Sequence, residues 1–315
     1  MKKIVVIGEI LVEVMADTIG EGFDAPQPLT GPFPSGAPAI FADQAAKLGH
    51  PVGIIAAVGD DDFGRINLAR LDRDGVDVSA VHIDPDRPTG SAFVRYRADG
   101  SRDFVFNIRH SASGRLQMTP AALTMLKSAD HLHVMGSSLS SPEFVALNLQ
   151  AAEDVKARAG TVSFDPNLRK EILSAPGMAK AMARFLVLTD VFLPSGEELT
   201  LLTRAKDYTA AIAELLSLGI TAIVHKDGAV GARYHDADGS LSVASFPVEE
   251  VDPTGAGDCF GGTFIALWLR GIAPANAMTI AAAAGALAVS RRGPMEGASD
   301  LATILSFIDS YKKVM

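Results

Sequence analysis

The chain has 315 residues, of which 48% are hydrophobic and 21% are charged. This composition is that of an ordinary globular protein and allows a large buried core. The formal net charge of −9 argues against a nucleic-acid-binding surface, because a phosphate backbone requires clustered Lys and Arg. An anionic small substrate is still compatible with this charge, since a pocket can be locally basic on an acidic protein.

The cysteine content and the N-terminal residues indicate where in the cell the protein is expected. The single cysteine, Cys259, rules out an internal disulfide and a cysteine zinc cluster, which fits a reducing cytoplasm. Two lysines followed by an apolar run look superficially like a signal peptide, but Glu9 and Glu13 interrupt the run and no small-residue cleavage site follows. No uninterrupted apolar stretch is long enough to span a bilayer. We therefore expect a cytoplasmic protein without a membrane segment.

The predicted elements alternate between strands and helices along most of the chain. Residues 2–15 predict an apolar strand, and residues 36–49 a helix that ends at a glycine. The later elements are a strand at 54–58, a helix at 63–74, strands at 130–135, 161–165, 191–194 and 220–225, helices near 142–158, 176–186 and 208–218, and a helix running to about residue 269. The small-residue run at 281–286 predicts a closely packed helix near the nucleotide, or plain core. Strands that alternate with helices and are apolar on both faces predict a mostly parallel sheet covered by helices.

Two segments break this alternation. Residues 12–33 are irregular and rich in Gly and Pro, whereas 91–97 and 102–109 are alternating, aromatic-containing runs. Asp-Gly in the turn between those runs is a hairpin signal. We interpret the insertions at about 12–33 and 88–112 as strands of a small sheet standing off one domain, 1–315. A lid over a cleft is the expected use, and a decorative hairpin or a homodimer contact through the lid is the alternative.

Residues 251–262 (VDPTGAGDCFGG) place a glycine-rich turn directly before an apolar helix. Gly255, Ala256 and Gly257 are small enough for their N–H groups to approach a ligand, and a helix N-terminus favours a phosphate-sized anion. Asp258 lies in the first turn, where the helix dipole predicts a weak base that orients a hydroxyl for phosphoryl transfer. A carboxylate beside ATP phosphates requires a divalent cation, for which Mg²⁺ is expected. The alternative is a glycine-rich turn whose aspartate only favours a helix N-terminus.

The string at 252–260, DPTGAGDCF, closely resembles the C-terminal signature of the PfkB (ribokinase-like) carbohydrate kinases. The resemblance extends over almost the whole chain. Further matches are Gly8-Glu9, a degraded glycine motif at 34–39, and the strings at 59–64, 165–169, 193–199 and 226–231. The resemblance implies a ribokinase-like three-layer α/β/α sandwich with a mostly parallel central sheet and a small β-sheet lid. It also implies an ATP-dependent kinase that phosphorylates a small sugar or sugar acid.

The resemblance also implies roles for individual residues. The catalytic candidates are Asp258 as the base and Gly255, Ala256 and Gly257 as the anion hole. The nucleotide-binding candidates are Ser195, Glu198, Lys226, Gly228 and Gly231. The candidates for holding a monovalent cation such as K⁺ are Asp252 and Thr254. For Lys226, a solvated lysine in a tight turn is the competing interpretation.

The substrate-binding candidates are Glu13, Gly36, Arg109, Asn167 and Arg169. The segment 100–112 resembles the lid of 2-keto-3-deoxygluconate kinases, in which arginines matching Arg109 and Arg169 meet the substrate carboxylate. A guanidinium suits this role because it donates two parallel hydrogen bonds. A solvated strand face is the alternative for two or three of the lid arginines, Arg95, Arg97, Arg102 and Arg109.

Several positions depart from the family pattern. Asn107 stands where the lid normally carries an aromatic hydroxyl, and Ile40 stands where the family has a sugar-contacting asparagine. These two changes leave room for a neutral ketohexose such as tagatose or fructose. Ser35, Ser195 and Ala282 also replace a glycine and two asparagines of the pattern, so the departures concern the substrate and the nucleotide rather than Asp258.

Two other functions remain open on the sequence. A nucleoside kinase of the same fold is disfavoured by the arginine-bearing lid and by an aromatic content of only 6%, because a nucleoside base requires stacking surfaces. A catalytically idle sugar-binding homologue is disfavoured by the intact Asp258 and glycine turn.

Overall fold

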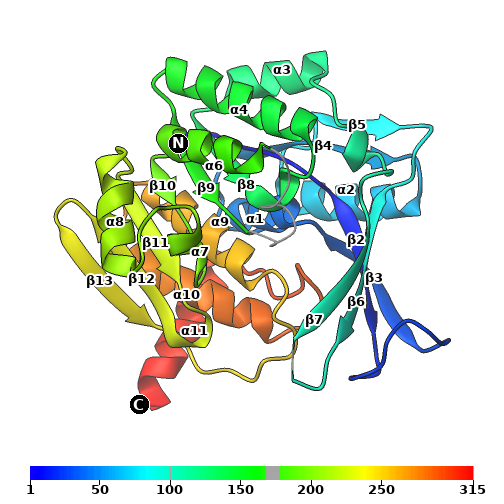
Figure 1. The fold of residues 1–315 in the computed structure, drawn as a ribbon. Coiled ribbons are helices and arrows are strands. Elements are labelled where there is room, and N and C mark those ends of the chain that lie inside the picture. The colour runs from blue at the N-terminus through cyan, green and yellow to red at the C-terminus, as the bar shows by residue number, and fades with distance from the viewer. Residues whose placement is uncertain (100, 168–176, 315) are drawn as a thin grey trace.

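The computed structural model describes residues 1–99, 101–167 and 177–314. Within these residues the main sheet has nine strands in the order β13-β12-β11-β10-β9-β8-β1-β4-β5 (Figure 1). Its strands are β1 (Ile4–Ile7), β4 (Val52–Gly59), β5 (Val81–Asp84), β8 (His131–Met135), β9 (Thr161–Asp165), β10 (Val191–Phe192), β11 (Ala222–Lys226), β12 (Gly231–Asp236) and β13 (Gly239–Ala244). The strands from β11 to β5 pair in parallel, and β12 and β13 pair antiparallel. The predicted mostly parallel sheet is confirmed.

Helices cover both faces of this sheet (Figure 1). One face carries α1 (Ala37–Lys47), α2 (Asp62–Arg73), α9 (Ala256–Trp268), α10 (Pro274–Val289) and α11 (Leu301–Val314). The other carries α3 (Pro120–Lys127), α4 (Pro142–Ala157), α6 (Met178–Leu188), α7 (Glu198–Leu201) and α8 (Tyr208–Ser217). In β1, Ile4 and Val6 enter one core while Val5 and Ile7 enter the other, because successive side chains of a strand point to opposite faces. The three-layer α/β/α sandwich is confirmed.

A second sheet of four strands forms the lid, in the order β3-β2-β6-β7 among the described residues. It consists of β2 (Leu11–Ala16), β3 (Leu29–Ser35), β6 (Gly90–Tyr96) and β7 (Arg102–Asn107), and it stands beside the main sheet in Figure 1. The predicted hairpin is confirmed, since β6 and β7 pair antiparallel.

The prediction of a single strand over residues 2–15 is wrong. The chain leaves the main sheet after β1 and enters the lid at β2. Hydrophobicity does not mark this boundary, because both strands are almost entirely buried. Gly8 lies at the crossing, where an added Cβ would come within 2.2 Å of the Ser138 hydroxyl oxygen.

Among the described elements, the sequence left β5, β12, β13, α3, α7 and α11 unpredicted. Strands β5 and β13 are largely exposed and carry polar residues, so they lack the apolar pattern of a buried strand. No helix in the described part of the chain combines the length and apolar character needed to cross a membrane.

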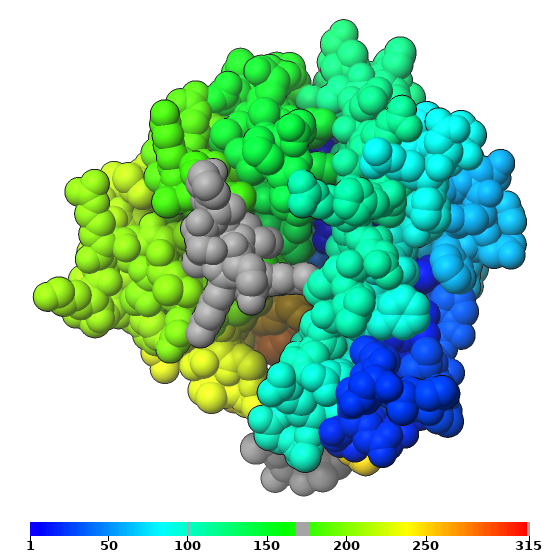
Figure 2. All heavy atoms as spheres, turned by 45° about the vertical axis from the view of Figure 1, so that its right-hand side comes forward, coloured from blue at the N-terminus to red at the C-terminus, as the bar shows by residue number. Residues whose placement is uncertain are grey.

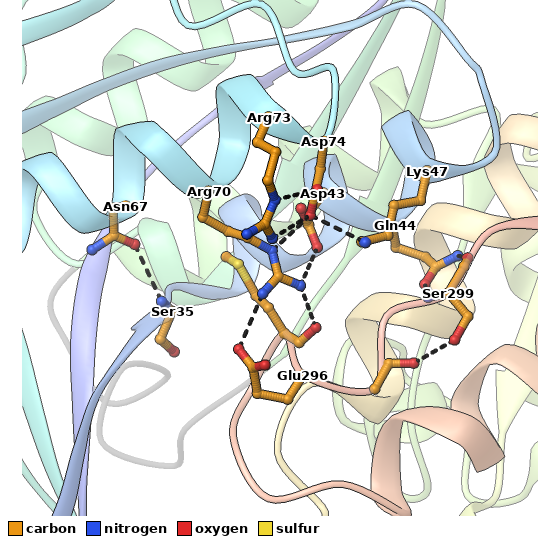
Figure 3. A network of polar contacts seen from close by, with 12 residues as sticks. Ser35, Asp43, Gln44, Lys47, Asn67, Arg70, Arg73, Asp74, Glu296 and Ser299 are labelled. Atoms are coloured by element: carbon orange, nitrogen blue, oxygen red, sulfur yellow. Dashed lines mark hydrogen bonds and ion pairs between the residues drawn. The ribbon is translucent and has the colours of Figure 1, made fainter.

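A buried polar network holds the segment after α10 against α1 and α2 (Figure 3). Arg70 of α2 donates to the backbone oxygen of Met295 at 2.6 Å and to Glu296 at 3.0 Å. The neighbouring Pro294 supports the glycine-rich turn before α9, because a Cβ added at Gly255 would lie 2.3 Å from the Pro294 carbonyl oxygen. The network therefore fixes the surface on which that turn rests.

Candidate active site

Two cavities meet at the turn before α9. The lid cavity, about 360 Å³, lies between the lid and α9, and the α10 cavity, about 540 Å³, is bounded by α10 and residues 245–250. Lys226, Pro253 and Gly257 line both cavities, so the glycine turn and β11 form their common wall. Figure 2 shows a hollow between the lid hairpin and the rest of the molecule, with orange residues of the C-terminal part at its bottom.

The turn has the geometry expected of an anion hole. Gly255 is the N-cap of α9 and has φ 81°, which a residue with a Cβ adopts only under strain. A Cβ at Gly257 would lie 3.6 Å from the Lys226 Nζ, so the backbone here comes close to a cation. The first N–H groups of a helix have no intrahelical partner and attract anions. Gly255 and Gly257 line the lid cavity, whereas Ala256 faces the α10 cavity.

Asp258 lies in the first turn of α9 and lines the lid cavity, as the sequence predicts. The prediction that it is a weak base is wrong for the chain alone. Burial and, after it, the nearby charge of Asp165 together raise the pKa of Asp258 to about 8, against the opposing charges of Lys226 and Arg102. A carboxylate with a pKa near neutrality is a better proton acceptor than an exposed one.

Glu13 of β2 presents a second buried carboxylate to the lid cavity. The Ser35 hydroxyl donates to Glu13 Oε2 at 3.1 Å, while Glu13 Oε1 has no hydrogen-bond partner among the described residues. Burial and, after it, the charge of Asp252 together raise the pKa of Glu13 to about 7. An unpartnered carboxylate oxygen in a cavity suits a hydroxyl donor from a ligand.

Two other predicted substrate residues also line the lid cavity. Gly36 has φ 112°, and a Cβ there would come within 2.5 Å of the Glu9 carbonyl oxygen, so only glycine fits the chain at this point. Asn167 follows β9 and its N–H donates to Asp165 Oδ1 at 3.2 Å.

Lys226 is buried rather than solvated, with 8% of its surface exposed. Its ammonium group forms an ion pair with Asp165 at the wall between the two cavities. Ser195 and Glu198 line the lid cavity, and the Ser195 N–H donates to Glu198 Oε2 at 2.7 Å. Gly228 and Gly231 line the α10 cavity instead. The competing interpretation of Lys226 as a solvated turn residue is therefore wrong.

Asp252 is completely buried behind the turn. Its Oδ1 accepts hydrogen bonds from the Thr254 N–H and the Tyr96 hydroxyl, both at 3.0 Å, and its Oδ2 accepts one from the Gly293 N–H at 3.0 Å. Across the described residues no basic side chain lies within 4.0 Å of it. Within the same residues no cluster of three or more His, Cys, Asp or Glu is arranged to hold a metal ion.

The predicted arginine pair is placed less favourably. Arg109 lies outside the lid cavity and lines a neighbouring cavity of about 640 Å³ with Asp61 and Thr89. Arg169 lies outside the described residues. The contact of either arginine with a substrate therefore stays a prediction.

The structure adds residues that the sequence reasoning did not select. Glu9, Asp165, Ser137 and Arg102 all line the lid cavity. Arg102 could have been found from the period of a strand, because it lies on the same face of β7 as Phe104 and Phe106, which also line the cavity. Nothing local in the sequence singles out Asp165 beyond its place in the matched string at 165–169.

Comparisons with known proteins agree with this geometry. The pfkB family carbohydrate kinase pattern matches residues 1–301. A 2-dehydro-3-deoxygluconokinase from Thermoproteus tenax is 32% identical over 305 residues, which cover 94% of this chain and 91% of that protein. An E. coli structure provisionally designated ribokinase II, in complex with ATP and Mg²⁺, is 49% identical with a TM-score of 0.94, covering 98% of this chain and 100% of the other. A double mutant of a fructokinase from Vibrio cholerae O395, in a form with bound fructose, ADP and potassium ion, is 28% identical with a TM-score of 0.82, covering 98% of each chain. The chain belongs to the pfkB family of carbohydrate kinases.

Proposed function

We propose that this ATP-dependent carbohydrate kinase transfers the γ-phosphoryl group to a primary hydroxyl of a ketose or keto sugar acid bound in the lid cavity. The observation that carries the proposal is the position of the glycine turn. It forms the wall between two cavities, and Asp258 projects from it into the lid cavity. A phosphoryl group crossing from one cavity to the other must therefore pass the helix N-terminus.

The α10 cavity is the proposed nucleotide site. Gly228, Gly231 and Gly285 leave space along its lining, and Ala282 and Phe246 supply apolar surface suited to a base. The E. coli relative binds ATP and Mg²⁺, which supports the assignment. The wall formed by Lys226 and Gly257 then lies beside the phosphates.

The carboxylates of Glu198 and Asp258 are hard oxygen ligands on the lid-cavity side of this wall, and they fit a Mg²⁺ ion shared with the phosphates. Bound there, Mg²⁺ supplies positive charge that offsets the repulsion between the phosphates and these carboxylates. We propose Asp252 and Thr254 for a monovalent cation, supported by the buried Asp252 carboxylate without an ion pair in the described chain and by the potassium ion in the fructokinase.

In the proposed reaction Asp258 accepts a hydrogen bond from the sugar hydroxyl and directs its oxygen at the γ-phosphorus. The N–H groups of the glycine turn bind the phosphoryl oxygens. The oxygen–phosphorus bond to the sugar forms as the bond to ADP breaks, and Asp258 takes the hydroxyl proton. Glu13 Oε1 and the surroundings of Gly36 hold the sugar in position for this step.

The charge of the lid cavity favours a neutral ketose, such as fructose or tagatose, over a sugar acid. The lining includes five carboxylate side chains, Glu9, Glu13, Asp165, Glu198 and Asp258. Its described cations are Lys226, which is already paired, and Arg102. A substrate carboxylate would meet a lining in which carboxyl groups outnumber the described cations.

A coupled assay of ADP release tests this proposal. The panel consists of fructose, tagatose, 2-keto-3-deoxygluconate, ribose and a set of nucleosides, each with ATP and Mg²⁺. We expect the largest kcat/KM with a ketohexose and slow ADP release without any sugar. Highest activity with a nucleoside, or ADP release that no sugar stimulates, would contradict the proposal.

A further inference from the structure

The lid hairpin carries three neighbouring arginines, of which Arg102 is bonded differently from the other two. Arg95 and Arg97 both form ion pairs with Asp103, at 2.7 and 2.8 Å. Arg102 has no carboxylate within 4.0 Å among the described residues. Its Nη1 donates instead to the hydroxyl oxygen of Thr254 at 2.6 Å, and its guanidinium lies 5.6 Å from the centroid of the Phe104 ring.

This bond brings Arg102 to the anion hole. Thr254 directly precedes Gly255 in the chain, and Arg102 lines the same cavity as Gly255, Gly257 and Asp258. A side chain 152 positions away in sequence therefore faces the reaction centre from the lid side.

A cation on the lid side of the cavity would stabilise the transferred group, in addition to the charge that Mg²⁺ supplies. A phosphoryl group in transit carries negative charge on its peripheral oxygens, and the lid cavity is lined mainly by carboxylates. Lys226 is already committed to an ion pair with Asp165. Arg102 offers the remaining N–H donors of its guanidinium fork, whose planar geometry matches phosphate oxygens.

We propose that Arg102 is a catalytic residue carried by the lid, which binds the oxygens of the phosphoryl group while it moves from ATP to the sugar. Thr254 anchors the guanidinium beside the glycine turn. The bond between the γ-phosphorus and the bridging oxygen of ADP breaks, the bond to the sugar oxygen forms, and the hydroxyl proton passes to Asp258. Arg102 takes no proton and forms no covalent bond. The inference rests on the proposed function of the lid cavity.

A carboxylate of the acceptor sugar is the other oxyanion that Arg102 could bind. In a six-carbon keto acid the carboxylate stands at the opposite end of the carbon chain from the terminal hydroxyl. Arg102 is bonded to the residue next to the anion hole, where that hydroxyl would be phosphorylated. The position of Arg102 therefore favours the phosphoryl group.

The test compares Arg102→Met with Arg97→Met, which removes an exposed arginine of the same hairpin that is paired with Asp103. Kinetics are measured with the best neutral ketohexose of the panel. We expect Arg102→Met to lower kcat about 100-fold, the effect typical of removing one donor to a developing oxyanion. The KM values for sugar and ATP should change less than about threefold, since the contact is made chiefly in the transition state. Arg97→Met should match the wild type.

A second readout separates this role from a structural one. Binding of ADP is measured by calorimetry with and without aluminium fluoride, a mimic of the phosphoryl group in transit, for both variants in the Asp258→Asn background and in the wild-type background. We expect Arg102→Met to lose the gain in affinity that aluminium fluoride gives, while its affinity for ADP alone is unchanged.

Three results would overturn the inference: an unchanged kcat, a lowered kcat with the aluminium fluoride gain intact, or an effect confined to the KM of a sugar acid. If the wild type phosphorylates no sugar of the panel, the proposed function fails, whereas the aluminium fluoride measurement still decides the role of Arg102.

Discussion

The turn before α9 and the lid hairpin contribute to the same cavity in different ways. The turn is one continuous string, residues 252–258, whose backbone conformation, small residues and carboxylate act together over a few ångströms. The hairpin acts through contacts across the molecule, from Tyr96 to Asp252 and from Arg102 to Thr254. In the proposed reaction, the groups that act on the phosphoryl group come from one local motif, whereas the lid is joined to this motif by contacts between distant segments.

The variant Asp258→Asn gives the sharpest test of the glycine turn, the local motif in this comparison. The amide keeps the shape of the side chain but cannot take the hydroxyl proton. We expect kcat to fall about 10³-fold, the scale of general base catalysis, while sugar binding by calorimetry stays near the wild-type affinity. Retained turnover would remove Asp258 from the role of base and would break the contrast between turn and lid.

Gly255→Ala tests the backbone of the turn. Its added Cβ would come within 2.3 Å of the Pro294 carbonyl oxygen at a φ of 81°, so the turn must shift. We expect kcat to drop about 100-fold, as when an oxyanion donor is displaced. The matched control is Gly271→Ala, which also has a positive φ, 72°, but open space around its Cβ. It should cost some stability and leave kcat unchanged; equal kcat losses in both variants would contradict the account.

On the lid side, Tyr96→Phe removes the hydroxyl that donates to the buried Asp252 carboxylate at 3.0 Å. Losing one donor to a buried carboxylate costs about 2 kcal/mol. We therefore expect a lower free energy of unfolding in urea and a KM for sugar raised several-fold, because the hairpin is held less firmly over the cavity. The control is Tyr234→Phe, which removes a hydroxyl bonded to Asp236 in β12, far from the lid in sequence. Tyr234→Phe should leave the KM for sugar unchanged. A similar rise of KM in this control would show that the effect of Tyr96→Phe is not specific to the lid.

The smallest expected effect concerns stability and pH. The pKa of Asp258 is raised from 3.8 to about 8 by burial, so the folded chain keeps a proton that the unfolded chain releases between these values. The contribution of this group to stability is thus lost as the pH rises from about 4 to about 8. Asp258→Asn does not titrate, and its melting temperature should exceed that of the wild type by roughly 2–5 °C at pH 8 and by almost nothing at pH 4. A difference that does not depend on pH would show that the carboxyl is not buried as described.

The sequence reasoning succeeded where the information is local. The alternation of strands and helices, the Asp-Gly hairpin and the start of α9 all follow from contiguous patterns, and the structure confirms them. The boundary between β1 and β2 was not predicted, because both strands are buried although they belong to two different sheets. Strands β12 and β13 were not predicted either, because β13 is mostly exposed and the two strands lie at the edge of the sheet.

The chemistry of individual side chains was harder to predict. The basicity of Asp258 depends on burial and on the charge of Asp165, which lies in another strand. The ion pair of Lys226 and the bond from Arg102 to Thr254 also join distant segments. The spacing of residues in the sequence does not indicate such contacts. The glycine turn could therefore be predicted from the sequence, but the charges and hydrogen bonds around it could not.

The central claim is that the phosphoryl group passes the glycine turn on its way to a hydroxyl held by Asp258. A crystal structure of the protein with ADP, aluminium fluoride, Mg²⁺ and the best ketohexose tests it most directly. We predict the fluoride ligands on the N–H groups of Gly255–Gly257 and the terminal sugar oxygen within about 3 Å of an Asp258 carboxylate oxygen. A sugar bound outside the lid cavity, or a terminal hydroxyl directed away from Asp258, would contradict the account.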